Sequence, residues 1–154
     1  MTLKKKKQKN RKYVASEISA GGIIFRINKN GTKEILLVRD SYNRWAIPKG
    51  KLEKKETAAE AALRELHEEV GLKNLEIKEK LGDLRFFYRF KNKLISKVIY
   101  VFLIKFIGTE KVIYQKKELK GAKWMTPEIA LKKIAYENTK KLLAKAVERL
   151  PNYR

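Results

Sequence analysis

The chain has 154 residues, enough for one domain with a single substantial core, and 44% of them are hydrophobic against 36% charged. This balance excludes a chain that is disordered throughout, because such chains lack the apolar side chains to build a core. The net charge of +21, from 38 basic and 17 acidic residues, favours polyanionic partners such as nucleotides, RNA or DNA. A lysine-rich surface selected for solubility is the alternative.

Membrane-spanning and disulfide-stapled secreted proteins are also excluded. No run approaches the ~20 apolar residues that span a bilayer, since the longest candidate, residues 98–107, is interrupted by Lys105. The charged N-terminus lacks the apolar segment of a signal peptide. With no cysteine, the chain has neither a disulfide nor a thiolate metal site. We therefore expect a cytoplasmic protein without a membrane partner.

Residues 1–14 predict a basic, disordered tail, and residues 15–154 a single folded domain. The tail has few apolar groups, and no acid stands among the bases Lys4, Lys5, Lys6, Lys7, Lys9, Arg11 and Lys12. Such a tail is expected to give nonspecific affinity for nucleic acids and no chemistry.

A β-hairpin is expected next in the chain. Its first strand, residues 18–27, is interrupted by Gly21-Gly22, which indicates a bulge or a close backbone approach. Residues 28–31 form the turn and residues 34–39 the second strand. Residues 45–56 contain Pro48 and Gly50 and have no helical period, so they predict a loop, with only two strands before the first helix.

The first helix is expected to begin at Thr57 and to end before Gly71. Thr57 and Glu60 have the spacing of a capping box, and Gly71 is suited to end the helix. Apolar residues recur at three- and four-residue steps and form a stripe that faces the core: Ala59, Ala62, Leu63, Leu66 and Val70.

Two further strands, residues 77–88 and 96–107, are joined by a polar turn at residues 89–93. The second of them is apolar on both faces, which predicts a central strand covered on both sides. A short segment ends at Met125, and Thr126-Pro127-Glu128 then begins a C-terminal helix that extends to Leu150 with a break near Asn138.

Three carboxylates, Glu65, Glu68 and Glu69, gather within five residues of this basic chain. At i, i+3 and i+4 they would converge on one helix face, turned away from the apolar stripe, and repel one another by roughly 0.2–0.5 kcal/mol per pair unless a cation binds. Oxygen ligands without cysteine or paired histidine suit Mg²⁺ or Mn²⁺. Such a metal polarises a phosphoryl oxygen and acidifies the attacking water, while a free glutamate takes the proton. A solvated acidic face with an Arg64–Glu68 ion pair is the alternative.

The stretch from Gly50 to Leu72 closely resembles the Nudix box of the Nudix (MutT-like) hydrolases. It consists of Gly50, five residues, Glu56, seven residues and Arg64-Glu65-Leu66-His67-Glu68-Glu69-Val70-Gly71-Leu72, with His67 at a variable position. The resemblance implies an α/β fold, an α/β/α sandwich with a mixed central sheet. It also implies Mg²⁺-dependent hydrolysis, with Mn²⁺ as a possible substitute, of a nucleoside diphosphate linked to another group.

The same resemblance implies roles for the box residues. Glu68 and Glu69 look like metal ligands, and Glu65 looks like a ligand or the general base. Arg64 and Glu56 look like the pair that orients them.

Two further positions are carried over from the family. Gly50 resembles the residue whose carbonyl joins the metal shell and whose small size lets the phosphate approach, with a simple turn glycine as the alternative. Glu118 resembles an extra ligand or base that some Nudix enzymes supply from outside the box, with an ordinary surface glutamate as the alternative.

The expected substrate is diadenosine tetraphosphate, split into ATP and AMP. Pro48-Lys49-Gly50 resembles the diadenosine polyphosphate hydrolase branch, with Lys49 and Lys51 as contacts to the phosphate chain. Phe86-Phe87-Tyr88 and Tyr100 fall on neighbouring strands and could stack a nucleobase, although aromatics at strand spacing are more often core residues. A pyrophosphohydrolase acting on RNA 5′ ends or damaged nucleoside triphosphates is one alternative. A catalytically idle nucleotide or RNA sensor is another, and the intact box speaks against it.

Overall fold

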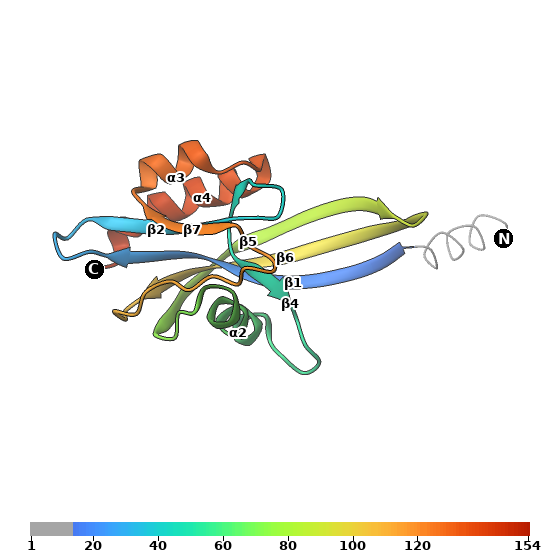
Figure 1. Cartoon of the computed structure of the whole chain (residues 1–154), viewed down its shortest axis with the longest axis horizontal. Coiled ribbons are helices and arrows are strands. Elements are labelled where there is room, and N and C mark those ends of the chain that lie inside the picture. The colour runs from blue at the N-terminus through green and yellow to red at the C-terminus, as the bar shows by residue number, and fades with distance from the viewer. Residues whose placement is uncertain (1–13) are drawn as a thin grey trace.

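The computed structural model describes residues 14–154 and shows an α/β/α sandwich on a seven-stranded mixed sheet (Figure 1). The strand order is β3-β2-β1-β6-β5, with β4 paired to β1 and β7 paired to β2. Strand β1 (Val14–Ile27) runs parallel to β6 (Lys93–Phe106), and the other pairs are antiparallel. The predicted sandwich and mixed sheet are confirmed. The predicted tail lies outside the described residues, apart from Val14, which begins β1.

The first hairpin joins β1 to β2 (Lys33–Arg39), as predicted. Gly21 and Gly22 form no bulge with β6, because β1 pairs with β6 residue for residue from Val14 to Phe25. The close backbone approach is the correct alternative, since a Cβ on Gly21 would lie 2.5 Å from the Pro48 carbonyl oxygen. That carbonyl accepts a hydrogen bond from the Gly22 N–H at 3.2 Å.

The prediction of a plain loop between residues 45 and 56 was wrong. Two short strands, β3 (Trp45–Ala46) and β4 (Lys49–Lys51), precede the helix there. They form because β1 and β2 pair with each other only near the turn, through residues 24–27 and 33–36. The freed edges of β1 and β2 pair with β4 and β3 instead.

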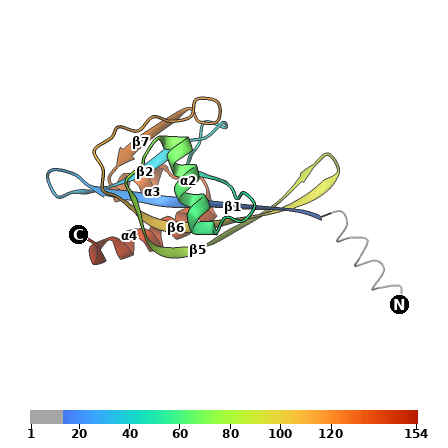
Figure 2. The ribbon, with the colours of Figure 1, turned by 90° about the horizontal axis from the view of Figure 1, so that it is seen from below.

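Strands β5 (Leu75–Phe90) and β6 are longer than predicted and form a hairpin that projects from the sandwich (Figures 1 and 2). The turn contains only Lys91 and Asn92, both with positive φ, at 49° and 63°. Positive φ at both central residues matches the twist of paired strands, so pairing continues to Phe90 and Lys93. The predicted turn at residues 89–93 was therefore too long.

Strand β6 lies inside the sheet, as predicted, and its two faces contribute to separate cores. Ile99, Val101 and Leu103 belong to the core beneath the C-terminal helices. Phe102 and Ile104 belong to the core beneath α2 (Ala58–Val70). The sheet thereby positions α2 on one face and the C-terminal helices on the other (Figure 1).

After β7 (Gly121–Met125), two helices and a short 3₁₀ turn complete the chain: α3 (Pro127–Lys133), α4 (Glu137–Arg149) and η1 (Leu150–Asn152). Thr126 caps α3, with its side chain accepting from the Ile129 N–H, as predicted. The break falls at residues 134–136, earlier than the predicted Asn138, because Ile134 and Tyr136 adopt extended backbone conformations. None of the helices within residues 14–154 combines the length and apolar character that crossing a bilayer requires.

Candidate active site

Helix α2 carries most of the acidic side chains of the candidate site, and both of its ends are fixed. Thr57 and Glu60 form the predicted capping box, each side chain accepting a hydrogen bond from the other residue's backbone N–H. Gly71 ends the helix with φ 72°, and its N–H donates to the His67 carbonyl oxygen. The register of the glutamates along the helix is therefore well defined.

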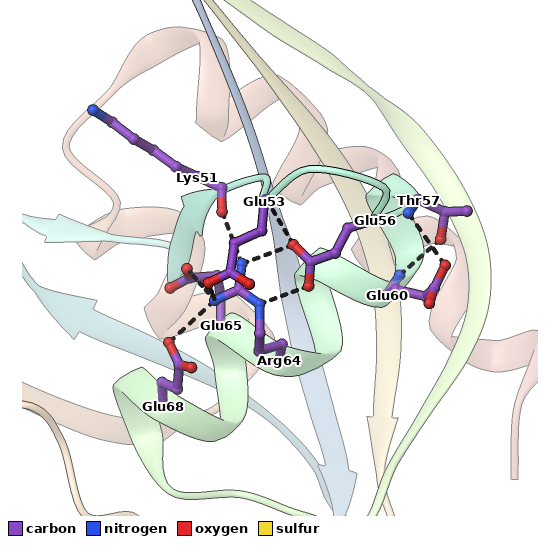
Figure 3. A network of polar contacts seen from close by, with 8 residues as sticks. All are labelled: Lys51, Glu53, Glu56, Thr57, Glu60, Arg64, Glu65 and Glu68. Atoms are coloured by element: carbon purple, nitrogen blue, oxygen red, sulfur yellow. Dashed lines mark hydrogen bonds and ion pairs between the residues drawn. The ribbon is translucent and has the colours of Figure 1, made fainter.

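Arg64 lies at the centre of an acidic network that joins the β4–α2 loop to the helix (Figure 3). Its guanidinium donates to both carboxylate oxygens of Glu56, at 2.6 and 2.9 Å, and to the Lys51 carbonyl oxygen at 2.9 Å. It also donates to Glu65 at 2.8 Å and to Glu68 at 3.2 Å. The fork on Glu56 lowers the pKa of that carboxyl to about 2. Arg64 and Glu56 are thus placed to orient Glu65 and Glu68.

We expect Arg64→Lys to lower kcat by about 10²-fold while leaving the fold intact. Lysine keeps the charge but loses the planar fork that holds Glu56 and Glu65 together, and small misplacement of a catalytic group has an effect of about that size. Arg149→Lys is the matched control, because Arg149 pairs with Glu79 outside this network. Equal kcat values for Arg64→Lys and the control, at equal melting temperatures, would contradict a positioning role.

Gly50 makes room for the carboxylate of Glu65. A Cβ on Gly50 would lie 2.0 Å from both Cδ and Oε2 of that side chain. The sequence suggested that the small size of Gly50 lets a phosphate approach. In the structure, the group that lies close to Gly50 is the carboxylate of Glu65. Glu65 is half-buried, and burial raises the pKa of its carboxyl, with Arg64 opposing and Glu68 and Glu118 reinforcing the shift.

Glu69 is buried, with 7% of its surface exposed. The prediction that Glu65, Glu68 and Glu69 share one face turned away from the core was therefore wrong for Glu69. Glu69 lies three residues after Leu66 and seven after Ala62, both fully buried, and therefore belongs to the face that packs on the sheet. One carboxylate oxygen accepts the Lys49 N–H at 3.0 Å. Burial, with the charges of Glu118 and Glu65, raises the pKa of Glu69 to about 7.

Glu118 approaches this cluster from the segment between β6 and β7. The Gln115 N–H donates to the Glu69 carbonyl oxygen at 2.8 Å, and the Glu118 N–H donates to the Gln115 carbonyl oxygen at 3.2 Å. The Glu118 side chain lies close enough to raise the pKa values of both Glu65 and Glu69. Glu118 therefore adjoins the cluster, as an extra ligand or base must.

The donor set fits a hard divalent cation. Within residues 14–154, no three carboxylate or imidazole side chains stand ready as a ligand shell, because Arg64 holds Glu65 and Glu68 while the Lys49 N–H holds Glu69. The donors are nonetheless all oxygens, and burial and the repulsion of nearby carboxylates penalise the negative charges of Glu65 and Glu69. A cation would relieve both effects, which suits magnesium or manganese.

A cavity of about 610 Å³ begins beside this cluster, at Lys49. One wall is the β5–β6 hairpin, with Phe86, Phe87, Tyr88 and Lys97, and the other comes from the β2–β3 loop and the α3–α4 linker. On that second wall the Tyr136 hydroxyl donates to the Asp40 carboxylate at 2.5 Å. The volume and the mix of aromatic and polar walls are those of a small-molecule site.

Two lysines, Lys49 and Lys97, line the cavity where it meets the carboxylates, and Lys51 lies near them with its side chain toward solvent. Burial lowers the pKa of the Lys97 ammonium, and the nearby charges of Lys49 and Lys51 lower it further against the opposing effect of Glu17. Such mutually repelling cations are stabilised by an anion. The cavity mouth therefore has the charge to hold a phosphate chain.

The family model of the NUDIX domain matches residues 18–146. The chain belongs to the Nudix hydrolase family. Among solved Nudix structures, the C. elegans Ap4A hydrolase in a binary complex is 30% identical, with a TM-score of 0.74 over 89% of this chain and 99% of that one. The E. coli dihydroneopterin triphosphate pyrophosphohydrolase is 16% identical, with a TM-score of 0.68 over 85% of this chain and 96% of that one, and supports the fold alone.

Among curated proteins, mutator protein MutT4 of Mycobacterium tuberculosis (strain CDC 1551 / Oshkosh) is 27% identical over 104 residues. The match covers 68% of this chain and 41% of that protein, so this chain spans well under half the length of the relative.

The Nudix box residues named from the sequence lie together. Two of the four predicted substrate contacts, Tyr100 and Lys51, do not line the cavity. Tyr100 lies on the α2 face of β6, opposite the cavity, beneath the Lys80 ammonium at 4.6 Å. The Lys51 side chain points to solvent, 3.6 Å from Glu17, and does not line the cavity. Lys49 and Tyr88 do line it, and His67 is exposed as expected.

Several cavity residues were missed by sequence reasoning. Asp40, Tyr42, Tyr136 and Thr139 come from separate loops and helix ends, which only the folded Nudix domain brings together. For Lys97 the sequence offered some indication, because a basic residue stands there in a largely apolar strand.

Proposed function

We propose that this chain is a Mg²⁺-dependent Nudix pyrophosphohydrolase, with Mn²⁺ as a possible substitute, that splits diadenosine tetraphosphate into ATP and AMP in the cytoplasm. The observation that carries the proposal is the position of Lys49. Its backbone N–H donates to the buried Glu69, and the residue also lines the aromatic cavity. One residue therefore connects the glutamate cluster with the cavity that would hold the nucleoside.

The metal would be held by Glu68, Glu69 and the Gly50 carbonyl, with Glu65 as a further ligand where Glu118 takes the proton. When bound there, Mg²⁺ or Mn²⁺ would supply positive charge to a phosphoryl oxygen and lower the pKa of the attacking water. Arg64 and Glu56 hold the Glu65 carboxylate in place through the hydrogen bonds of Figure 3.

The proton of the attacking water would pass to a glutamate oxygen. Glu65 is the first candidate, because its half-buried carboxylate lies against Gly50 in β4 and is oriented by Arg64. Glu118 is the second, because it approaches the same cluster from another segment.

The nucleoside would lie in the cavity and the phosphates along its lysines. Phe86 and Tyr88 offer aromatic faces for the base. Lys49 and Lys97 supply the positive charge for a tetraphosphate, which carries more negative charge than the phosphates of a mononucleotide. The bases of residues 1–12 would add nonspecific affinity for nucleic acids, which a substrate with an RNA 5′ end would also use.

We expect Lys97→Met to raise the KM for diadenosine tetraphosphate about tenfold and to change kcat less. A tenfold change corresponds to about 1.4 kcal/mol of binding free energy, a reasonable value for one half-buried contact to phosphate. Lys132→Met on α3 removes the same charge from an exposed position outside the cavity and serves as the control. Steady-state kinetics of both variants give the comparison, and equal KM values would remove Lys97 from the phosphate path.

A substrate panel tests the proposed function. Diadenosine tetraphosphate, diadenosine triphosphate, ATP, nucleotide sugars and triphosphorylated RNA would be incubated with Mg²⁺, Mn²⁺ or EDTA, and the products resolved by chromatography. We expect metal-dependent release of ATP and AMP from diadenosine tetraphosphate at the highest kcat/KM. Absence of turnover on every substrate would instead support the idle sensor.

A further inference from the structure

The hairpin of β5 and β6 extends beyond both helix layers of the sandwich. Its outer end, with the adjoining end of β1, projects past α2 on one face and past the C-terminal helices on the other (Figures 1 and 2). The extension consists of residues 84–98 and residues 14–19 of β1 beside them, and at its base Leu84 is still buried in the core beneath the C-terminal helices. We call this three-stranded extension the basic arm. The described chain begins at this end, since Val14 pairs with Leu94 near the hairpin turn.

The basic arm combines positive charge with aromatic rings, and its one acid is Glu17 on β1, which pairs with Lys51. Residues 84–98 contain no aspartate or glutamate, and they include Arg85, Arg89, Lys91, Lys93, Lys97, Phe86, Phe87, Tyr88 and Phe90. Phe87 and Phe90 are 68% and 58% exposed. Exposed aromatic rings among positive charges suit a partner that offers flat apolar surfaces and negative charge.

Three of these side chains form a row on one face of β5. Arg85, Phe87 and Arg89 alternate along the strand, which pairs regularly with β6 from Gly82 to Phe90. Their partners across β6 are Val98, Ser96 and Leu94, on the face that carries Tyr100 and, farther along, the core beneath α2. Arg85 keeps 66% of its side chain exposed despite a weak pair with Asp83 at 3.9 Å. The row is thus an exposed ring between two guanidinium groups.

We propose that the basic arm binds single-stranded nucleic acid, with a base stacked on Phe87 and the adjacent phosphates contacted by Arg85 and Arg89. Stacking needs only an open aromatic face and tolerates any base, while phosphate contacts supply charge neutralisation. A second copy of this chain is the less suitable occupant. Strand β5 is the edge of the sheet, and pairing two such edges would bring the arginines of both copies together. Phe87 is also among the residues that line the cavity, so this surface adjoins the proposed active site, although binding to it requires no hydrolysis.

The test is fluorescence anisotropy of the full chain with a labelled single-stranded RNA that has a 5′ hydroxyl, so that no anhydride is available for cleavage. Phe87→Ala and Phe87→Leu are each expected to raise the Kd about tenfold, whereas Phe87→Trp retains affinity. Leucine keeps an apolar side chain but removes the aromatic face. Equal Kd values for Phe87→Leu and the wild type would overturn the proposed stacking contact.

The arginines have their own control. Arg85→Gln with Arg89→Gln is expected to make the slope of log Kd against log salt concentration shallower by roughly 1.4, because each lost contact to a single strand changes that slope by about 0.7. Lys132→Gln with Lys140→Gln removes two exposed charges from α3 and α4 and should change the slope less. Equal effects of the two double variants would overturn the proposal and leave only nonspecific attraction.

Two further measurements separate the basic arm from other contributions. Deleting residues 1–12 should weaken RNA binding, yet the tenfold effect of Phe87→Ala should persist in the shortened chain. Light scattering should give the same mass for the wild type and Phe87→Ala. A dimer that dissociates in Phe87→Ala would assign the surface to a second copy and overturn the proposal.

Discussion

Glu69→Gln is expected to lower kcat by roughly a thousandfold or more, with little change in folding. Glutamine keeps the shape of the side chain and an oxygen to accept the Lys49 N–H, but it removes the negative charge that a cation needs. A thousandfold loss corresponds to about 4 kcal/mol in the transition state, within the several kcal/mol that a metal supplies.

The stability of the variant makes this prediction specific. Glu69 is buried beside other acids, so removing its charge relieves repulsion, and without metal the variant should melt at the same temperature as the wild type or slightly higher. Glu76→Gln, on the exposed side of β5, is the control and should retain full turnover. Near-normal turnover of Glu69→Gln in Mg²⁺ would refute the metal-site assignment.

Gly50→Ala is expected to lower kcat by about a hundredfold. The new methyl group would lie 2.0 Å from the Glu65 carboxylate, a distance that no side chain tolerates, so Glu65 must leave its place on Arg64 or β4 must shift. Displacement of a reacting group by about 1 Å is sufficient for a loss of this size.

Gly121→Ala is the matched glycine control. Its Cβ would meet ordinary contacts, with Arg39 Nε nearest at 3.5 Å, and Gly121 lies in β7 outside the site. Kinetics and thermal melts of both variants would be compared. Equal turnover in the two alanine variants would contradict the close packing of Glu65 on Gly50.

The sequence predicted the parts of the site that are local in the chain. The capping box at Thr57, the helix end at Gly71 and the spacing of the glutamates all depend on residues within one helix and its flanks. The central position of β6 was predictable for a similar reason, because a strand that is apolar on both faces is stable only inside a sheet.

Features that depend on the approach of distant segments were not predictable. The burial of Glu69 depends on how α2 packs on the sheet and on Lys49, and its charge suggested exposure instead. The placement of Tyr100 depends on which face of β6 the cavity occupies, and period-two alternation alone does not decide this. Glu118 reaches the cluster only because backbone hydrogen bonds tie its segment to the end of α2.

The most direct test of the proposed activity compares diadenosine tetraphosphate with ATP under identical Mg²⁺ and salt, in water labelled with heavy oxygen. We expect kcat/KM for the dinucleotide to be at least about tenfold higher, equivalent to about 1.4 kcal/mol of transition-state binding. The label should appear in only one of the two products, AMP or ATP, and so identify the phosphorus attacked. A tenfold preference for ATP, or for triphosphorylated RNA in the same assay, would contradict the dinucleotide assignment. The metal site would then still be supported if EDTA abolished turnover of the preferred substrate.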